Sequence, residues 1–294
     1  MKTDMNTIQP NKVDKLHPIA HKLILVLLSA VAVTMIFPMI NVLSVSLSEA
    51  TKSNYPGLIL WPQGFTFEGY DFIWNRINLW RPFVITVYVS VVGTILHIFL
   101  SSMAGYVLIH EDLPFRKLFT SFVLLTMAVP GELTLVSLYE INKQLHLTNT
   151  LSAIIINGAA SGLSILLMRN YFSSVPKSLL EASKLDGASE LKTFINVYLP
   201  LSGSGIVTIG TLEFIRRWNN ITITVSLLSK RSLWTMPVYL REILFEQSNT
   251  AGSEFIFANA QMAAVVLTAV PLVILYFFTQ DFFNSGVTLG AVKE

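Results

Sequence analysis

Long apolar stretches without charge are the feature that most constrains this chain. The stretch 23–47 holds no charged residue, and the first acidic residue after it is Glu49. A helix needs about 20 residues to cross a hydrocarbon core of roughly 30 Å, so this stretch predicts a membrane-spanning helix. Composition favours the same class of fold, because 52% of the 294 residues are hydrophobic and only 13% are charged, whereas soluble domains carry about 25% charge.

Five further stretches predict the rest of the membrane domain. They cover about 83–109, 118–138, 151–168, 201–228 and 257–279. We therefore expect an all-α membrane protein with six transmembrane helices, in which residues 1–22 form a tail and residues 23–294 a single transmembrane domain. Lysine and arginine are more frequent in the tails, near residue 116 and in 169–200 than in the other loops. This bias places both termini in the cytoplasm.

Several classes of function are excluded by what the sequence lacks. A net charge of +2 is too balanced for a nucleic-acid-binding surface. The absence of cysteine removes thiol nucleophiles and cysteine-based zinc sites. No phosphate-binding loop, HExxH or G-x-S-x-G pattern occurs. We therefore expect no catalytic residue, no metal ligand and no cofactor in this chain.

The segment 173–200 is too polar to cross a membrane and too regular to be a slack loop. Apolar and small residues recur at helical spacing in its first half, at Leu179, Leu180, Ala182, Ser183 and Leu185. This pattern predicts a short amphipathic helix, which Asp186 and Gly187 would end. A second short helix is expected before Pro200. One interpretation is a helix that lies on the lipid surface, although the acidic residues balance the lysines.

The residues of this segment closely resemble the EAA loop of bacterial ABC-importer permeases. The matching residues are Glu181-Ala182-Ser183, Asp186-Gly187-Ala188, Phe194, Val197 and Leu199-Pro200. Ser183 replaces the second alanine of the motif and Val197 its isoleucine. Segments such as SVSLS (44–48), LREIL (240–244) and GVTLGAVK (286–293) extend the resemblance over nearly the whole chain. They resemble carbohydrate-uptake permeases, above all the branch for aldouronate and other oligosaccharides derived from polysaccharides.

This resemblance implies a multi-pass subunit of an importer in the bacterial plasma membrane. Its partners would be a homologous second permease, two cytoplasmic ATPase subunits that bind the ATP and magnesium, an external solute-binding protein and an oligosaccharide. The segment 173–200 would be the coupling loop between the fourth and fifth spans, with its helix in a cleft of the ATPase. Leu179, Leu180 and Leu185 would then be buried there, Ala182 and Ser183 would permit close approach, and Glu181 would accept a hydrogen bond from an ATPase arginine. Gly187, after Asp186, would set the turn.

The predicted fifth span carries charges within the membrane. Glu213, Arg216, Arg217 and Asn220 stand at i, i+3, i+4 and i+7, which predicts one helical face. One interpretation is a structural ion pair between Glu213 and one of the two arginines, with the other arginine bound to a group of the second permease. The other is a face lining the translocation path, where guanidinium groups bind carboxylates of an acidic sugar and Asn219 and Asn220 bind hydroxyls. The surplus arginine favours uronate oligomers such as alginate fragments over neutral sugars.

Three other functions remain open at this point. A permease for neutral oligosaccharides would share every feature except the surplus positive charge. An ion-coupled secondary transporter would more typically show internal repeats around broken helices, and it would not need the EAA-like segment. A scaffold or receptor subunit that gates nothing is the third.

Overall fold

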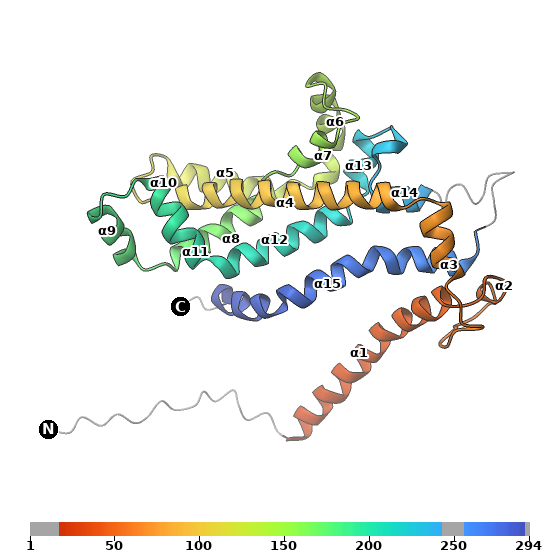
Figure 1. Ribbon diagram of the computed structural model, residues 1–294. Coiled ribbons are helices and arrows are strands. Elements are labelled where there is room, and N and C mark those ends of the chain that lie inside the picture. The colour runs from red at the N-terminus through yellow and green to blue at the C-terminus, as the bar shows by residue number, and fades with distance from the viewer. Residues whose placement is uncertain (1–17, 243–255, 292–294) are drawn as a thin grey trace. The chain divides into compact units, whose positions relative to one another are not determined.

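The first apolar stretch forms helix α1 (Pro18–Ser46), and helices account for all the regular structure in the described part of the chain (Figure 1). The structure is a computed structural model that describes residues 18–242 and 256–291. Within these ranges the one strand-like feature is an isolated bridge between Ser48 and Phe65. The all-α class predicted from the sequence is therefore confirmed.

The chain divides into two units, of which the first comprises residues up to 70 together with 257–263. It contains α1, α2 (Ala50–Ser53), most of α3 (Glu68–Asp71) and the start of α15 (Ala258–Ala291). Buried Asn259 holds this unit together, because its side chain donates to the carbonyl of Ser48 at 3.1 Å and its backbone N–H to Ser53 Oγ at 3.1 Å.

The second unit comprises residues 71–256 and 264–294. Its helices, besides the remainder of α15, are α4 (Trp80–Val107), α5 (Arg116–Ala128), α6 (Leu135–Gln144), α7 (Leu151–Ile156), α8 (Gly162–Ser173), α9 (Lys177–Leu185), α10 (Glu190–Thr193), α11 (Leu199–Leu201), α12 (Gly203–Trp218), α13 (Thr222–Leu227) and α14 (Met236–Arg241). Short 3-10 or π turns cover Phe72–Arg76, Gly131–Thr134, Phe194–Tyr198 and Arg231–Leu233. Helix α4 packs along α8 and α12, and α5 packs on α8 (Figure 1).

Three described helices are long and apolar enough to cross a membrane, over Ile19–Ser46, Trp80–Val107 and Ala258–Phe282. Two bent pairs could each add a span: Arg116–Ala128 with Gly131–Gln144, bent by 93°, and Glu190–Leu201 with Gly203–Trp218, bent by 80°. The described residues thus offer three to five spans by length and composition. The predicted fourth span is divided between α7 and α8, and the count of six stays a prediction.

The break between α7 and α8 has a local cause in the sequence. Gly158 has a φ of +81°, which side-chain-bearing residues rarely adopt. Ser161 then begins the next helix, because its hydroxyl accepts a hydrogen bond from the backbone N–H of Ser164 at 3.3 Å. Thr150 caps α7 in the same way through Ala153. The segment therefore turns within the apolar stretch instead of continuing as one helix.

Aromatic packing holds the end of α4 against the segment that follows α8. Tyr106 lies 5.1 Å from Phe194 and 5.0 Å from Tyr198, ring centroid to ring centroid, and Phe172 contacts all three rings. Beside this cluster, α4 and α8 approach each other closely at Gly105. A Cβ at this position would lie 2.8 Å from Met168 Cβ and 2.9 Å from the backbone nitrogen of Arg169.

Substituting Gly105 with alanine should destabilise the protein, because the added methyl group meets atoms that are not free to move away. We expect a loss of about 1–3 kcal/mol, typical of an overpacked site, measured as a lower melting temperature in detergent micelles. Gly203→Ala is the matched control, since nothing lies within 4 Å of the added Cβ there. Equal melting temperatures for the two variants would contradict the close approach of α4 and α8.

Candidate functional site

The segment 173–200 folds into short helices at one end of α4 (Figure 1). Helix α9 covers the predicted amphipathic stretch and ends at Leu185; Asp186 is its C-cap, and Gly187 follows with a φ of +70°. Ser189 begins α10 by accepting a hydrogen bond from the backbone N–H of Lys192 at 3.4 Å. The predicted helix, turn and second helix are therefore present, while their role in coupling stays a prediction.

The residues predicted to face an ATPase divide into two groups. Ser183 is buried, and its hydroxyl lies 2.5 Å from that of Thr193. Leu180 is half-buried against the aromatic cluster of Tyr106. The exposed members are Leu179, Glu181, Ala182, Leu185, Asp186 and Gly187, and the side chain of Leu185 is 89% exposed. The sequence alone did not reveal that Ser183 and Leu180 pack on the chain's own core.

Charged and polar contacts join this segment to the end of α4. Tyr106 donates a hydrogen bond to Glu190 Oε2 at 2.7 Å, and Lys184 Nζ lies 3.6 Å from Glu190 Oε1. Lys177 donates to Glu111 Oε1 at 2.6 Å. This hydrogen bond holds the pKa of the Glu111 carboxyl below its usual value and raises the pKa of Lys177. The segment is thus held from both α9 and α10.

The two arginines of α12 share one carboxylate, that of Glu213. Glu213 Oε1 accepts from Arg217 Nε and from Arg216 Nη2, each at 2.6 Å, and Oε2 accepts from Arg216 Nε at 2.7 Å. The side chains of Glu213 and Arg217 are only 5% and 3% exposed, whereas that of Arg216 is 44% exposed. One carboxylate against two guanidinium groups leaves one positive charge, and it lies on the exposed side.

Arg217 also donates hydrogen bonds to backbone carbonyls at the break between α7 and α8. Its Nη1 donates to the carbonyl of Ile154 at 3.1 Å and its Nη2 to that of Gly158 at 2.8 Å. His97 Nδ1 lies 2.7 Å from the same Gly158 carbonyl and must donate, because a carbonyl oxygen only accepts. In the neutral ring, Nε2 then accepts from Ser164 Oγ at 2.8 Å. Both partners lie far from His97 in the chain, at separations of 61 and 67 residues.

The predicted helical face does not include Asn220. Helix α12 ends at Trp218, so Asn220 lies beyond it. Its side-chain oxygen accepts a hydrogen bond from the backbone N–H of Ile223 at 3.0 Å. Asn219 donates from Nδ2 to the carbonyl of Ile215 at 3.1 Å. The prediction of four residues on one face is therefore wrong at its last position, because asparagine begins the next turn instead of extending the helix.

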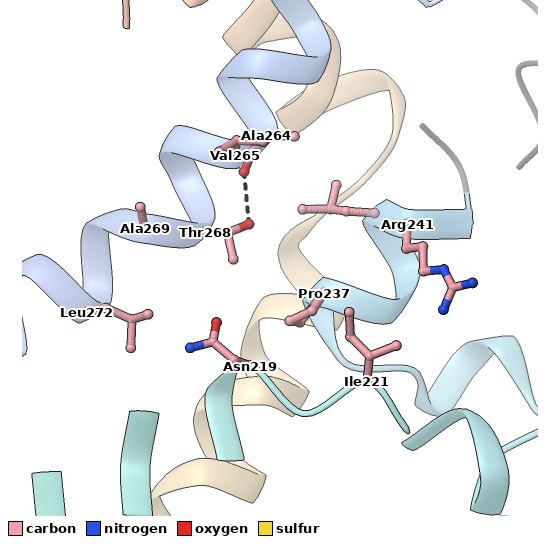
Figure 2. A pocket seen from close by; sticks show the side chains of 10 residues that line it. Asn219, Ile221, Pro237, Arg241, Ala264, Val265, Thr268, Ala269 and Leu272 are labelled. Carbon is pink, nitrogen blue, oxygen red and sulfur yellow. Dashed lines mark hydrogen bonds between the residues drawn. The ribbon is translucent and has the colours of Figure 1, made fainter. Parts of the chain in front are cut away.

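Two cavities lie near these residues. The larger, of about 810 Å³, is lined by the bend between α5 and α6, the α7–α8 break and the start of α13, with Glu132, Gly158, Ser161 and Asn220 among its residues. The Arg216 guanidinium lies so close to Gly158 that a Cβ there would overlap it. The second cavity, of about 430 Å³, lies between α14, α15 and Asn219 after α12 (Figure 2). Most of its lining side chains are apolar.

The chain is similar to known transport proteins over most of its length. Residues 97–289 match the family described as "Binding-protein-dependent transport system inner membrane component". An arabinooligosaccharides transport system permease protein of Halalkalibacterium halodurans is 29% identical, covering 95% of this chain and 99% of its own. A polygalacturonan/rhamnogalacturonan transport system permease protein of Bacillus subtilis is 28% identical, covering 89% and 94%.

Solved structures share the fold, among them that of a sugar importer. It is a crystal structure of a bacterial ABC transporter involved in the import of the acidic polysaccharide alginate. The matching chain has a TM-score of 0.82 and 24% sequence identity, and the match covers 94% of this chain and 100% of that chain. This likeness shows the arrangement of the helices.

The two neighbouring arginines should differ in their effect on stability. Arg217→Gln breaks a buried ion pair, removes the donor to the carbonyl of Ile154 and leaves the carbonyl of Gly158 with His97 alone, which should cost about 3–5 kcal/mol. Arg216→Gln removes a partly exposed side chain and should change the melting temperature much less. Thermal unfolding of both variants in detergent tests this difference. If Arg216→Gln were as damaging as Arg217→Gln, both arginines would be structural.

Proposed function

Because the chain belongs to the family of binding-protein-dependent transport system inner membrane components, we propose that it is a permease subunit of an ATP-driven importer of acidic oligosaccharides. A homologous second permease would complete the membrane channel. Two cytoplasmic ATPase subunits would bind ATP and magnesium, and an external solute-binding protein would deliver the sugar. The relatives are transport permeases, so hydrolysis is assigned to the partners.

The observation that supports an acidic substrate is the partial exposure of Arg216. Arg217 donates to Glu213 and to two carbonyls of the broken helix. Among the described residues Arg216 donates hydrogen bonds to Glu213 alone, and 44% of its side chain is exposed. A guanidinium group can bind a carboxylate through two parallel hydrogen bonds. We assign Arg216 as the group that meets a uronate carboxylate, and Arg217 and Glu213 as its support.

The larger cavity supplies the polar groups that a sugar needs. Glu132 can accept hydrogen bonds from hydroxyl groups, and Ser161 and Asn220 can donate or accept them. Its volume of about 810 Å³ lies within the range of small-molecule sites, roughly 300–1,000 Å³. Asn219 lines the second cavity instead, so we assign it no sugar contact.

Coupling to the ATPase is assigned to the exposed face of α9. Leu179 and Leu185 would pack into the ATPase cleft, Ala182 would permit close approach, and Glu181 would accept from an arginine there. Ser183 and Leu180 would instead transmit the motion, since they contact Thr193 and the aromatic cluster. ATP-driven closure of the ATPase pair would move α9 and turn the cavity between inward-facing and outward-facing states.

The remaining assignments concern topology and sidedness. We propose six spans in the bacterial inner membrane, in which α7 and α8 together form the fourth, and both termini in the cytoplasm with α9. Family membership gives no support to an ion-coupled secondary transporter. A neutral oligosaccharide is the second candidate substrate, because the relative from H. halodurans carries the name of arabinooligosaccharides.

The substrate assignment is tested by ATPase stimulation of the full complex with its binding protein in proteoliposomes. Uronate oligosaccharides should stimulate hydrolysis, and neutral ones of matched length should not. In Arg216→Gln, uronate uptake should fall by roughly tenfold, the loss expected for a charge-assisted pair. Arg216→Lys should be intermediate, because lysine keeps the charge without the planar fork. Stimulation by neutral sugars alone, with uptake insensitive to residue 216, would establish the neutral alternative.

The coupling assignment predicts that Leu185→Ser weakens binding of the ATPase to the permease without unfolding the permease. Burying a leucine side chain contributes about 1.5–3 kcal/mol, so stimulated hydrolysis and co-purification of the ATPase should both fall. Leu145→Ser is the matched control, because that leucine is also exposed but lies at the end of α6, away from α9. Unchanged stimulated hydrolysis in Leu185→Ser would remove α9 from the coupling role.

A further inference from the structure

A second polar cleft lies at the amino-terminal end of α4, apart from the cavities already described. Its volume is about 400 Å³, and it is lined by Asn78, Arg81, Pro82, Arg231, Ser232 and Tyr239. We propose that this cleft binds a carboxylate-bearing sugar unit of the oligosaccharide before it enters the translocation path. The inference rests on the proposed function, since it gives the same substrate class an additional site.

The charge of the cleft is uncompensated. Its lining contains two arginines and no aspartate or glutamate. Within residues 18–242 and 256–291, neither Arg81 nor Arg231 takes part in an ion pair. The first turn of α4 also has no acidic residue. An anion entering the cleft therefore meets two guanidinium groups without having to displace a carboxylate of the described chain.

Arg231 lies over an aromatic ring, and its side chain donates no hydrogen bond to the described part of the chain. Its guanidinium carbon lies 5.4 Å from the centre of the Tyr239 ring, a stacking distance that stabilises a cation over an aromatic face. Tyr239 is fixed in turn, because its hydroxyl donates to the carbonyl of Ile77 at 2.9 Å. A contact of this kind uses none of the guanidinium N–H groups as donors to the ring oxygen or the backbone, so they can serve a carboxylate.

The loop that carries Arg231 and Ser232 is anchored on both sides. Asn149 Oδ1 accepts three hydrogen bonds from it: Ser229 N at 2.7 Å, Ser229 Oγ at 2.9 Å and Lys230 N at 3.0 Å. Beyond the turn, the backbone N–H of Met236 donates to buried Thr86 at 2.7 Å. The binding groups are thus positioned before a ligand arrives, which lowers the entropic cost of binding.

The shape and chemistry of the cleft favour a sugar over a protein surface. A concave site of about 400 Å³ falls in the range of small-molecule pockets, whereas protein partners generally bury wider and flatter areas. Asn78 and Ser232 line the cleft together with the two arginines, and an amide and a hydroxyl can pair with the hydroxyls that surround the carboxylate of a uronate ring.

The position of the cleft agrees with a role in entry. It lies where α4 begins, and α9 lies near the opposite end of that helix (Figure 1). If α9 is cytoplasmic, as proposed, the cleft opens on the outer side of the membrane, where the binding protein releases its cargo.

The test is direct binding to the full transporter complex in nanodiscs of zwitterionic lipid, without nucleotide and without the binding protein. A fluorescently labelled uronate tetrasaccharide and a neutral one of equal length serve as probes. The parent complex should bind the uronate and not the neutral probe. The double variant R81Q/R231Q should bind the uronate at least roughly tenfold more weakly, and R81K/R231K should be intermediate. Lys143→Gln, an exposed basic residue of α6 outside the cleft, should leave the affinity unchanged.

Three outcomes would overturn the inference. The parent complex could fail to bind the uronate probe, or R81Q/R231Q could bind it normally while melting at the parent temperature. Uronate binding could also be unchanged while the variant needs more binding protein to stimulate the ATPase, which would make the cleft a protein-docking surface. The proposed function fails separately, since it requires uronate stimulation of the parent complex with its binding protein, whatever residues 81 and 231 do.

Discussion

Backbone carbonyl groups released by a broken helix cannot be satisfied by lipid, and the arrangement around α12 depends on how this chain satisfies them. The α7–α8 break leaves the carbonyls of Ile154 and Gly158 without helical partners, and Arg217 donates to both. A buried guanidinium needs a counter-charge, which Glu213 provides. Gly93 on α4 makes space for the Arg217 side chain, since a Cβ at this position would overlap the guanidinium. One requirement for hydrogen bonds therefore joins α4, α7, α8 and α12.

The same network explains why two adjacent arginines have different environments. Residues 213 and 217 stand four apart on α12 and both point to the broken helix, where they are buried. Arg216, three residues from Glu213, reaches the same carboxylate from the exposed side. The buried arginine and the exposed one are thus neighbours on one helix, and the Glu213 carboxylate that they share holds Arg216 beside Gly158.

Local patterns in the sequence predicted the elements and the short-range contacts. The long apolar stretches became α1, α4 and α15, the three-residue spacing became α9, and the spacing of Glu213, Arg216 and Arg217 became two ion pairs. Each depends only on helical periodicity, which neighbouring residues determine. The resemblance to importer permeases drawn from the EAA-like segment is likewise confirmed.

Contacts between distant segments could not be predicted in this way. Ser183 is half of a buried pair because Thr193 lies across a turn, and periodicity alone could not distinguish that face from one facing a partner. The carbonyl that His97 meets belongs to a broken helix that reads as one apolar stretch. Asn220 was misplaced because its side chain starts a new turn. The cleft at Arg81 and Arg231 joins residues 150 positions apart, with no shared motif.

Helix α4 has 28 residues and carries no proline past its first turn, so its length is about 42 Å. If a rigid helix of this length tilts by about 10° about one end, the other end moves by about 7 Å, which is more than the rise of one helical turn. The aromatic and polar contacts of Tyr106 lie at one end of α4, and Arg81 lies at the other end. If α4 moves as a rigid body, a small rotation at one end would displace the other end by a distance comparable with the width of a sugar ring.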